Sequence, residues 1–175
     1  MRERTSSRAS ARSRTDRVRS HFASADRVLI MMQDDPDPDA IASALALRTL
    51  LGRTKAAAPI ATFGTITRPE NRAMTRILDI DVEEIKGHAI DEYDMVAMVD
   101  AQPSFFEEAF GEVDLVIDHH PEETPARAHL RDIRPSWGAT STIMTEYLRA
   151  ADVKITQRLA TALLYGIKTD TLHLE

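Results

Sequence analysis

Residues 28–43 read VLIMMQDDPDPDAIAS and join an apolar run to a helical pattern through an acidic turn. The apolar run from Val28 to Met32 is typical of a strand that is buried on both faces of a parallel sheet. Pro36 and Pro38 favour an extended turn, and Pro38 also suits the first turn of the helix that follows. The stretch therefore predicts a strand, a turn and a helix, which together form the opening unit of an α/β fold.

Carboxylates are crowded into this turn. Four of them fall within six residues: Asp34, Asp35, Asp37 and Asp39. Like charges at such spacing repel one another, and a divalent cation is the simplest ligand that relieves the repulsion. Because open α/β sheets bind ligands outside the carboxyl ends of their strands, we expect Asp37 and Asp39 to hold a metal ion or to lie beside a phosphate.

Two later apolar runs end in the same way. Residues 94–100 read DMVAMVD and end at Asp100, and residues 113–120 read VDLVIDHH. Their alternation with helical patterns indicates a mostly parallel sheet with right-handed crossovers. Such a sheet brings all three strand ends to one edge, so we expect the acids and histidines there to form one site.

The remaining elements are predicted from periodicity and turn signals. Strands are expected at residues 59–63 and 127–134, and helices at 70–78, 137–150 and from 156 onward. Gly166 is expected to turn the backbone sharply before Asp170.

Two helix starts carry candidate substrate contacts. Arg68 precedes one of them, and Ser141 lies in the Gly-Ala-Thr-Ser run at 138–141 that opens another. Backbone amides at a helix start favour anions, so both residues are candidates for binding phosphate. The same residues also suit capping, packing or a surface position, and the sequence leaves these alternatives open.

The composition excludes several classes of protein. The chain has 175 residues, which fits one domain, with 43% hydrophobic and 29% charged residues. It has no cysteine, so disulfides, thiolate zinc sites and cysteine nucleophiles are excluded. No apolar run approaches the roughly 18 residues that a transmembrane helix needs. We therefore expect a cytoplasmic protein without a membrane-spanning segment.

Charge is distributed unevenly along the chain. Residues 1–20 contain seven Arg against Glu3 and Asp16, a net +5, which leaves −11 for the rest of a chain whose net charge is −6. Residues 1–14 are rich in Arg and Ser without apolar periodicity, so we predict a disordered leader, followed by a short helix at 15–24. The leader is either a nucleic-acid tether or a solvated segment. The acidic remainder would repel phosphate unless a bound cation inverts its field.

Seven acids and imidazoles at predicted strand or helix ends exceed the needs of one metal ion: Asp37, Asp39, Asp100, Asp118, His119, His120 and Asp170. Two ions that share a bridging carboxylate are the natural interpretation, and such pairs activate water against phosphate esters. Mixed carboxylate and imidazole ligands suit Mn²⁺, with Zn²⁺, Fe²⁺ and Co²⁺ as alternatives.

Four short motifs resemble those of the DHH family of phosphoesterases: PDPDA at 36–40, VDA at 99–101, DHH at 118–120 and GIKTDT at 166–171. The resemblance runs from residue 25 to residue 175 and implies a three-layer α/β/α sandwich around a parallel sheet. The run at 138–141 also resembles that of family members which cleave short oligonucleotides and small phosphorylated nucleotides.

The resemblance also implies a role for each site residue. It implies ligands for two Mn²⁺ ions that share one carboxylate: Asp37 and Asp100 for the first ion, and Asp39, Asp100, His119 and Asp170 for the second. Asp118 would orient the histidines and His120 would contact the substrate phosphate, so these two residues are the expected catalytic pair.

The sequence departs from the family pattern at two points. The first motif of the family usually opens with a metal-binding His four residues before the first Asp, and Gln33 stands there. A carboxamide is a poorer ligand than an imidazole, so Gln33 is a weak candidate ligand and the first metal site is expected to bind less tightly. The catalytic domain of the family, here residues 15–175, is normally followed by a smaller substrate-binding domain. The chain is therefore either a fragment or a protein that lost its substrate lid.

The sequence thus predicts a metal-dependent hydrolase that cleaves phosphate esters of nucleotides or short oligonucleotides, of the oligoribonuclease and phosphoadenosine-phosphatase type. An inorganic pyrophosphatase is the alternative enzyme, and a non-hydrolytic nucleotide- or metal-binding module is the alternative outside enzymes. The expected partner is the nucleotide substrate. A homodimer and a domain downstream of residue 175 stay open.

Overall fold

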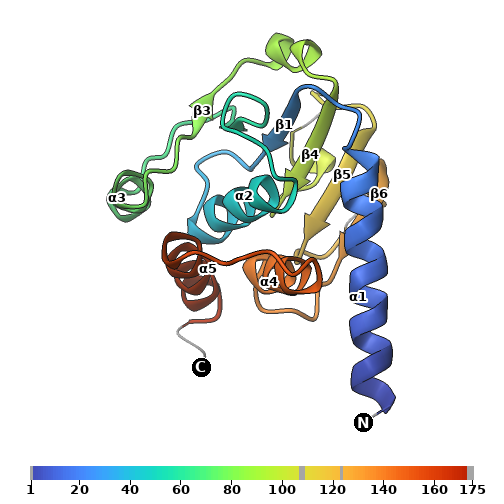
Figure 1. Ribbon diagram of the computed structural model, residues 1–175. Coiled ribbons are helices and arrows are strands. Elements are labelled where there is room, and N and C mark those ends of the chain that lie inside the picture. The colour runs from blue at the N-terminus through green and yellow to red at the C-terminus, as the bar shows by residue number, and fades with distance from the viewer. Residues whose placement is uncertain (1, 107–108, 123, 173–175) are drawn as a thin grey trace.

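The protein is built on one six-stranded sheet in which every strand pair is parallel. The computed structural model describes residues 2–106, 109–122 and 124–172 (Figure 1). The strands lie in the order β3-β2-β1-β4-β5-β6. Their bounds are Val28–Met31 (β1), Ile60–Thr62 (β2), Glu83–Glu84 (β3), Met95–Val99 (β4), Val113–Asp118 (β5) and Ala128–Ile133 (β6). The predicted α/β class with a mostly parallel sheet is confirmed.

The order of the strands reverses between β1 and β4. From β1 the chain moves outward to β2 and β3, then returns to the other side of β1 and continues outward through β5 and β6. The register pairs Met31 with Met98, and Val99 with Ile117, so the carboxyl ends of the three central strands lie at one edge. A crevice forms at such a reversal point, and the acidic turn after β1 and the acid after β4 flank it.

All five α-helices of the described residues pack on one side of the sheet. They are α1 (Arg2–His21), α2 (Pro38–Leu50), α3 (Pro69–Ile77), α4 (Thr140–Ala150) and α5 (Gln157–Asp170). The larger apolar cluster joins Ile30, Val99 and Ile117 of the sheet to the buried sides of these helices. Helix α2 lies at the centre of this layer, against β1 and β4 and next to α4 and α5, and nearly all of its residues are buried.

The opposite face of the sheet is covered by shorter elements. The 3₁₀ helices η1 (Gly87–Glu92) and η2 (Pro103–Phe106) and their connecting segments lie there. The rings of Phe63, Phe106 and Phe110 contact one another with centroids 5.2–5.7 Å apart and cover Met31 and Met98. The third layer of the expected sandwich is therefore made of 3₁₀ turns and aromatic side chains. No helix among the described residues is long and apolar enough to cross a membrane.

The first helix differs from the sequence prediction. Helix α1 begins at Arg2, whereas a disordered leader was predicted over residues 1–14 and a helix only from Thr15. The second half of the helix is held in place by contacts that sequence periodicity does not reveal. Ala11 is buried, and the guanidinium of Arg14 donates to Glu146 of α4 at 2.6 Å. Tertiary anchoring of one helix face therefore outweighs the polar composition of the segment.

The last helix also differs from its prediction. Gly166 was expected to redirect the backbone, yet α5 runs through it to Asp170. A Cβ atom at this position would lie 2.7 Å from Ser141 Oγ, 3.0 Å from Asp39 Cα and 3.1 Å from the Pro38 carbonyl oxygen. The glycine therefore serves close packing of α5 against the first turn of α2, and it brings Asp170 to the carboxyl edge of the sheet.

Replacing Gly166 with Ala is expected to destabilise the protein by about 1–3 kcal/mol, because two of the three close contacts involve backbone atoms that cannot move aside cheaply. Helix propensity alone would favour Ala by about 1 kcal/mol. The measurement is the free energy of unfolding in urea, with and without Mn²⁺.

Gly111→Ala is the matched control, because no described atom lies within 4 Å of its added Cβ and its φ is not positive. This variant should be as stable as the wild type or more stable by up to about 1 kcal/mol. Equal stabilities for the Gly166 and Gly111 variants would contradict the close packing of α5 on α2.

Candidate metal centre

Asp37 forms the N-terminal cap of α2. One of its carboxylate oxygens accepts hydrogen bonds from the backbone amides of Asp39 at 2.9 Å and Ala40 at 3.0 Å, and Pro38 occupies the first helical position. Burial raises the pKa of Asp37, and the nearby Asp170 raises it further. The acidic turn is thus shaped by ordinary helix capping, which sets the direction of its carboxylate.

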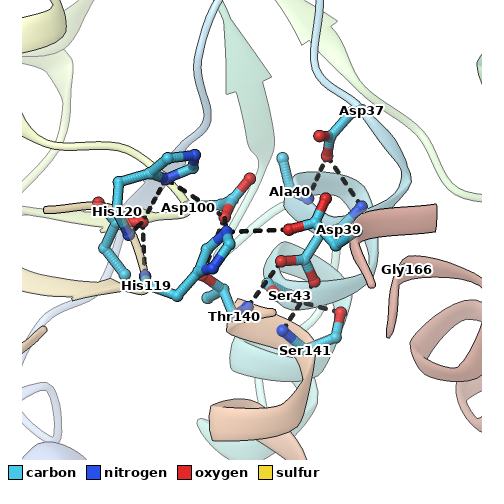
Figure 2. A network of polar contacts seen from close by, with 12 residues as sticks. Asp37, Asp39, Ala40, Ser43, Asp100, His119, His120, Thr140, Ser141 and Gly166 are labelled. Atoms are coloured by element: carbon cyan, nitrogen blue, oxygen red, sulfur yellow. Dashed lines mark hydrogen bonds and ion pairs between the residues drawn. The ribbon is translucent and has the colours of Figure 1, made fainter. Parts of the chain in front are cut away.

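Asp39 joins the first turn of α2 to the start of α4. Its side chain is completely buried, and its two oxygens accept from the amides of Thr140 at 2.6 Å and Ser141 at 2.7 Å (Figure 2). Burial raises the pKa of Asp39 to about 6 despite these hydrogen bonds. The positive end of the α4 dipole compensates part of the charge of this carboxylate.

Asp100 carries a buried oxygen atom without a partner. The residue follows β4 with a φ of 56° and is 1% exposed. Its Oδ1 accepts from the Thr140 hydroxyl at 2.9 Å, whereas Oδ2 has no hydrogen-bond partner among the residues that the structure describes. Burial, together with the charges of Asp39 and Asp37, raises the pKa of Asp100 well above its usual value. A buried carboxylate without full compensation is costly unless a cation satisfies it.

His119 faces two of these acids. Its Nε2 atom lies 2.9 Å from Asp170 Oδ2 and 3.6 Å from Asp100 Oδ1. Its Nδ1 lies 3.2 Å from the carbonyl oxygen of Trp137, and because a carbonyl can only accept, Nδ1 donates. Asp170 raises the pKa of His119 to about 9. The second ring nitrogen is therefore directed at the carboxylates, as in histidines that bind metals through one nitrogen and are oriented through the other.

Asp118 organises the adjacent histidine. It is completely buried and accepts from Gln102 Nε2 at 2.7 Å, from the His119 amide at 2.8 Å and from His120 Nδ1 at 2.8 Å. Burial raises the pKa of Asp118, but the hydrogen bonds from His120 and Gln102 outweigh it, so the pKa is lowered overall. The ring of His120 is held through Nδ1 and is still 39% exposed.

Comparisons with known proteins show the family to which the chain belongs. The model of the DHH family, N-terminal domain, matches residues 27–167. The chain belongs to the DHH family. It is 41% identical over 145 residues to an uncharacterized protein of Methanocaldococcus jannaschii, a match that covers 82% of this chain and 30% of that protein.

A solved structure has the same fold. The exopolyphosphatase-related protein from Bacteroides fragilis superimposes with a TM-score of 0.73 at 19% sequence identity, over 93% of this chain and 51% of that one. The chain therefore spans 30% of the length of the curated relative and about half of the solved structure.

The residues of this DHH domain fit a divalent metal. Two sets of three groups have all their donor atoms within 4.8 Å of one another: Asp39, His119 and Asp170 in one, and Asp100, His119 and His120 in the other. The first set is contained in the ligand set expected for the second ion. Oxygen and imidazole donors together suit Mn²⁺ and the borderline divalent metals. The unpartnered oxygen of Asp100 supports the same conclusion.

Three other residues that the sequence offered as substrate contacts or as a ligand are absent from these two sets of metal-binding groups. Ser141 is completely buried, its amide donates to Asp39, and its hydroxyl lies 3.4 Å from that of Ser43, so its geometry fits the packing alternative. Substrate contact by Ser141 stays a prediction.

Arg68 is exposed at the start of α3, next to Thr67, whose hydrogen bonds lower the pKa of Asp35 in the acidic turn, and the charge of Arg68 lowers it further. Substrate contact by Arg68 stays a prediction. Gln33 is half-buried after β1, where its backbone carbonyl accepts from Thr62. Gln33 as a ligand stays a prediction.

Sequence reasoning missed three groups that support the site. Thr140 holds both Asp39 and Asp100, Gln102 holds Asp118, and the backbone carbonyl of Trp137 orients His119. Only Thr140 left a signal, because it lies in the run at 138–141 that was expected either to cap a helix or to bind phosphate. A glutamine side chain and a backbone carbonyl carry no sequence pattern of their own.

Asp100→Asn is expected to stabilise the metal-free protein at pH 8 and to weaken Mn²⁺ binding by at least about 10-fold. The amide removes a charge that burial and neighbouring acids disfavour, and Asn tolerates the positive φ. Urea unfolding and calorimetric titration measure the two effects.

The matched control is Asp94→Asn at the opposite end of β4, where the exposed carboxylate accepts from the amides of Asp26 and Arg27. It should leave Mn²⁺ affinity unchanged. If the Asp100 variant bound Mn²⁺ as tightly as the wild type, Asp100 would not be a ligand.

Mn²⁺ binding at pH 7.5 is expected to release about one proton, because a histidine with a pKa of about 9 is protonated before a metal takes its nitrogen. Affinity should then rise with pH up to about 9. Calorimetry in two buffers of different ionisation enthalpy counts the proton, and His119→Gln should abolish the release. A wild-type titration without proton release would exclude His119 as a ligand.

Proposed function

We propose that this chain is the catalytic part of a divalent-metal-dependent phosphoesterase that acts on nucleotides or short oligonucleotides. The observation that carries the proposal is the buried Oδ2 atom of Asp100, which has no hydrogen-bond partner among the described residues. The other oxygen of this carboxylate, Oδ1, lies 3.6 Å from His119 Nε2, and the residue stands at the strand-order reversal of the sheet. Membership of the DHH family, whose motifs are those of phosphoesterases, supports the reaction class.

The ligand assignment proposed here is the one that the resemblance to the DHH family implies, and the grouping of Asp39, His119 and Asp170 within 4.8 Å supports part of it. Five residues would hold two Mn²⁺ ions: Asp37, Asp39, Asp100, His119 and Asp170. When bound, divalent ions neutralise the charge of a phosphate and lower the pKa of water, so that a nucleophile forms at neutral pH. The side chains of Asp39 and Asp37 are held by helix amides, which keeps their oxygens in place without a metal.

His120 is the group proposed to meet the substrate. Its Nδ1 is bonded to Asp118, so Nε2 is available on a partly exposed ring. The hydrogen bond with Asp118 raises the pKa of His120, which favours the imidazolium form near neutral pH. A positively charged ring binds a phosphate oxygen and has a proton to donate to the leaving oxygen.

The side chain of Phe105 favours a nucleoside over an inorganic phosphate. Phe105 is 44% exposed, and its ring meets the ring of His120 edge to face with centroids 5.9 Å apart. A nucleotide whose phosphate contacts His120 would bring its sugar or base close to this exposed ring. Bases stack on aromatic side chains, whereas pyrophosphate has no group that gains from one.

Two other candidates remain as outcomes of the test. An inorganic pyrophosphatase would use the same acids and imidazoles but would not depend on Phe105. A non-hydrolytic module would bind metal and nucleotide without turnover, and the Gln33 substitution in the first motif motivates it. A homodimer, a further domain and a cytoplasmic location stay predictions.

The test measures hydrolysis of a dinucleotide, of phosphoadenosine phosphate and of pyrophosphate across a Mn²⁺ titration. We expect turnover of the nucleotide substrates to increase with Mn²⁺ occupancy. Phe105→Leu should raise KM for them by about 5-fold or more, since stacking contributes about 1–3 kcal/mol per base. His120→Ala should reduce turnover while Mn²⁺ affinity is nearly kept.

Phe105→Tyr is the matched control, because it retains the aromatic face and should keep KM close to that of the wild type. Turnover of pyrophosphate alone, with no effect of Phe105→Leu, would favour the pyrophosphatase. Mn²⁺ binding without turnover of any of the three compounds would favour the binding module.

A further inference from the structure

Helix α1 lies outside the residues that the DHH model matches, yet it contacts the elements behind the metal centre. The family match begins at residue 27, whereas α1 ends at His21. The helix packs against α4 (Figure 1). Its residues Thr15 and Val18 are buried. The contact between α1 and α4 includes a cluster of charged side chains.

The charged cluster contains two arginines and two acids: Arg14 of α1, Asp132 of β6, Arg134 after β6 and Glu146 of α4. Both arginines donate to Glu146 Oε1, Arg14 at 2.6 Å and Arg134 at 2.9 Å. Arg134 also donates two hydrogen bonds to Asp132, at 2.7 and 2.6 Å. The side chains of Arg134 and Asp132 are only 13% and 12% exposed. The cluster is electrically balanced and mostly shielded from water, which makes its pairs stronger than surface ion pairs.

Arg134 connects this cluster to the histidine of the metal centre. Its guanidinium carbon lies 4.5 Å above the centroid of the Trp137 ring, in a cation–π contact. The backbone carbonyl of Trp137 accepts the hydrogen bond of His119 Nδ1 at 3.2 Å. The Trp137 amide donates to the Arg134 carbonyl at 2.9 Å, so the two residues belong to one tight turn. The position of Arg134 therefore determines where the acceptor for His119 lies.

We propose that Arg14 is a positioning residue for the metal centre, acting on His119 through Glu146, Arg134 and Trp137. The proposal rests on the proposed metal site, because it concerns the nitrogen that His119 presents to a metal. It assigns to α1 a role that the family-matched residues do not contain.

The physical reason lies in the charge balance of the cluster. Without Arg14, two partly buried acids would share the single guanidinium of Arg134. Glu146, which is 25% exposed, would then gain more from turning toward water than from staying in the cluster. Arg134 would lose one acceptor and part of its fixed geometry, and the turn that carries the Trp137 carbonyl would loosen.

Helix α1 also supplies a matched control. Arg12 lies on the same helix and pairs with Asp152 at 3.1 Å, but the two side chains are 61% and 67% exposed. Arg12→Ala removes the same charge from the same helix without touching the cluster. An exposed pair of this kind contributes little to stability.

The experiment compares Arg14→Ala, Arg14→Lys, Arg134→Met and Arg12→Ala by two readouts that need no turnover. The first is the ¹⁵N chemical shift of His119 in the metal-free protein, and the second is Mn²⁺ affinity by calorimetry, both at a temperature where every variant is folded. Arg134→Met should weaken Mn²⁺ binding about 10-fold, in the range of changes to groups that orient metal ligands, and Arg14→Ala about 3-fold.

Both variants should move the His119 Nδ1 shift, whereas Arg12→Ala should move neither readout. Arg14→Lys should restore most of the affinity, because it keeps a charged donor for Glu146. In a double-mutant cycle, the effect of Arg14→Ala should nearly disappear once Arg134 is Met.

A purely structural role gives a different result. If Arg14→Ala lowered the melting temperature but left the His119 shift and the Mn²⁺ affinity as in the wild type, the proposal would be overturned. Equal effects of Arg12→Ala and Arg14→Ala on Mn²⁺ affinity would overturn it as well. Failure of the proposed metal site itself would show separately, as a wild-type protein that does not bind Mn²⁺.

Discussion

The carboxylate of Asp39 connects the layers of this protein at the edge where the metal centre lies. It belongs to the first turn of α2, and its oxygens accept the first amides of α4 from residues about a hundred positions away. Gly166 of α5 lies against the Asp39 backbone and the Ser141 hydroxyl. Three helices therefore meet at one buried charge, and the placement of α4 and α5 on the sheet depends on it. Because Thr140 also donates to Asp100, the same contact joins the helices to β4.

This arrangement lowers the stability of the metal-free fold, because it buries carboxylates whose charges repel one another. Asp39 and Asp100 are buried within reach of each other's field, and burial raises the pKa of both. The backbone amides of α4 compensate Asp39, but one oxygen of Asp100 has no partner among the described residues. Natural proteins keep such groups where function needs them, at a cost in stability.

The supporting contacts of the two histidines come from different parts of the chain. His120 is held by Asp118, two residues away, so its orientation is a local property of the strand end. His119 is held by the carbonyl of Trp137, which follows β6 and is supported by Arg134. Within the DHH motif, Asp118 therefore fixes the orientation of the His120 ring. The orientation of the His119 ring is fixed by the turn that contains Trp137. Helix α1, which precedes the family-matched region, reaches that turn through its side chains.

The sequence by itself determined five of the six strands, the class of fold and the strand ends that carry the acids and histidines, whereas the two-residue strand β3 was not predicted. The apolar runs that precede Asp37, Asp100 and His119 were recognisable as strands, because a buried parallel strand needs a continuous apolar segment. Such a segment is a local property of the sequence. Only the tertiary structure decided that Asp39 caps α4, that Gly166 continues its helix and that α1 begins at Arg2. Those features depend on partners far away in the chain, such as Thr140 for Asp39. Hydrophobic periodicity indicates which segments are buried, but it does not indicate which distant group a side chain contacts.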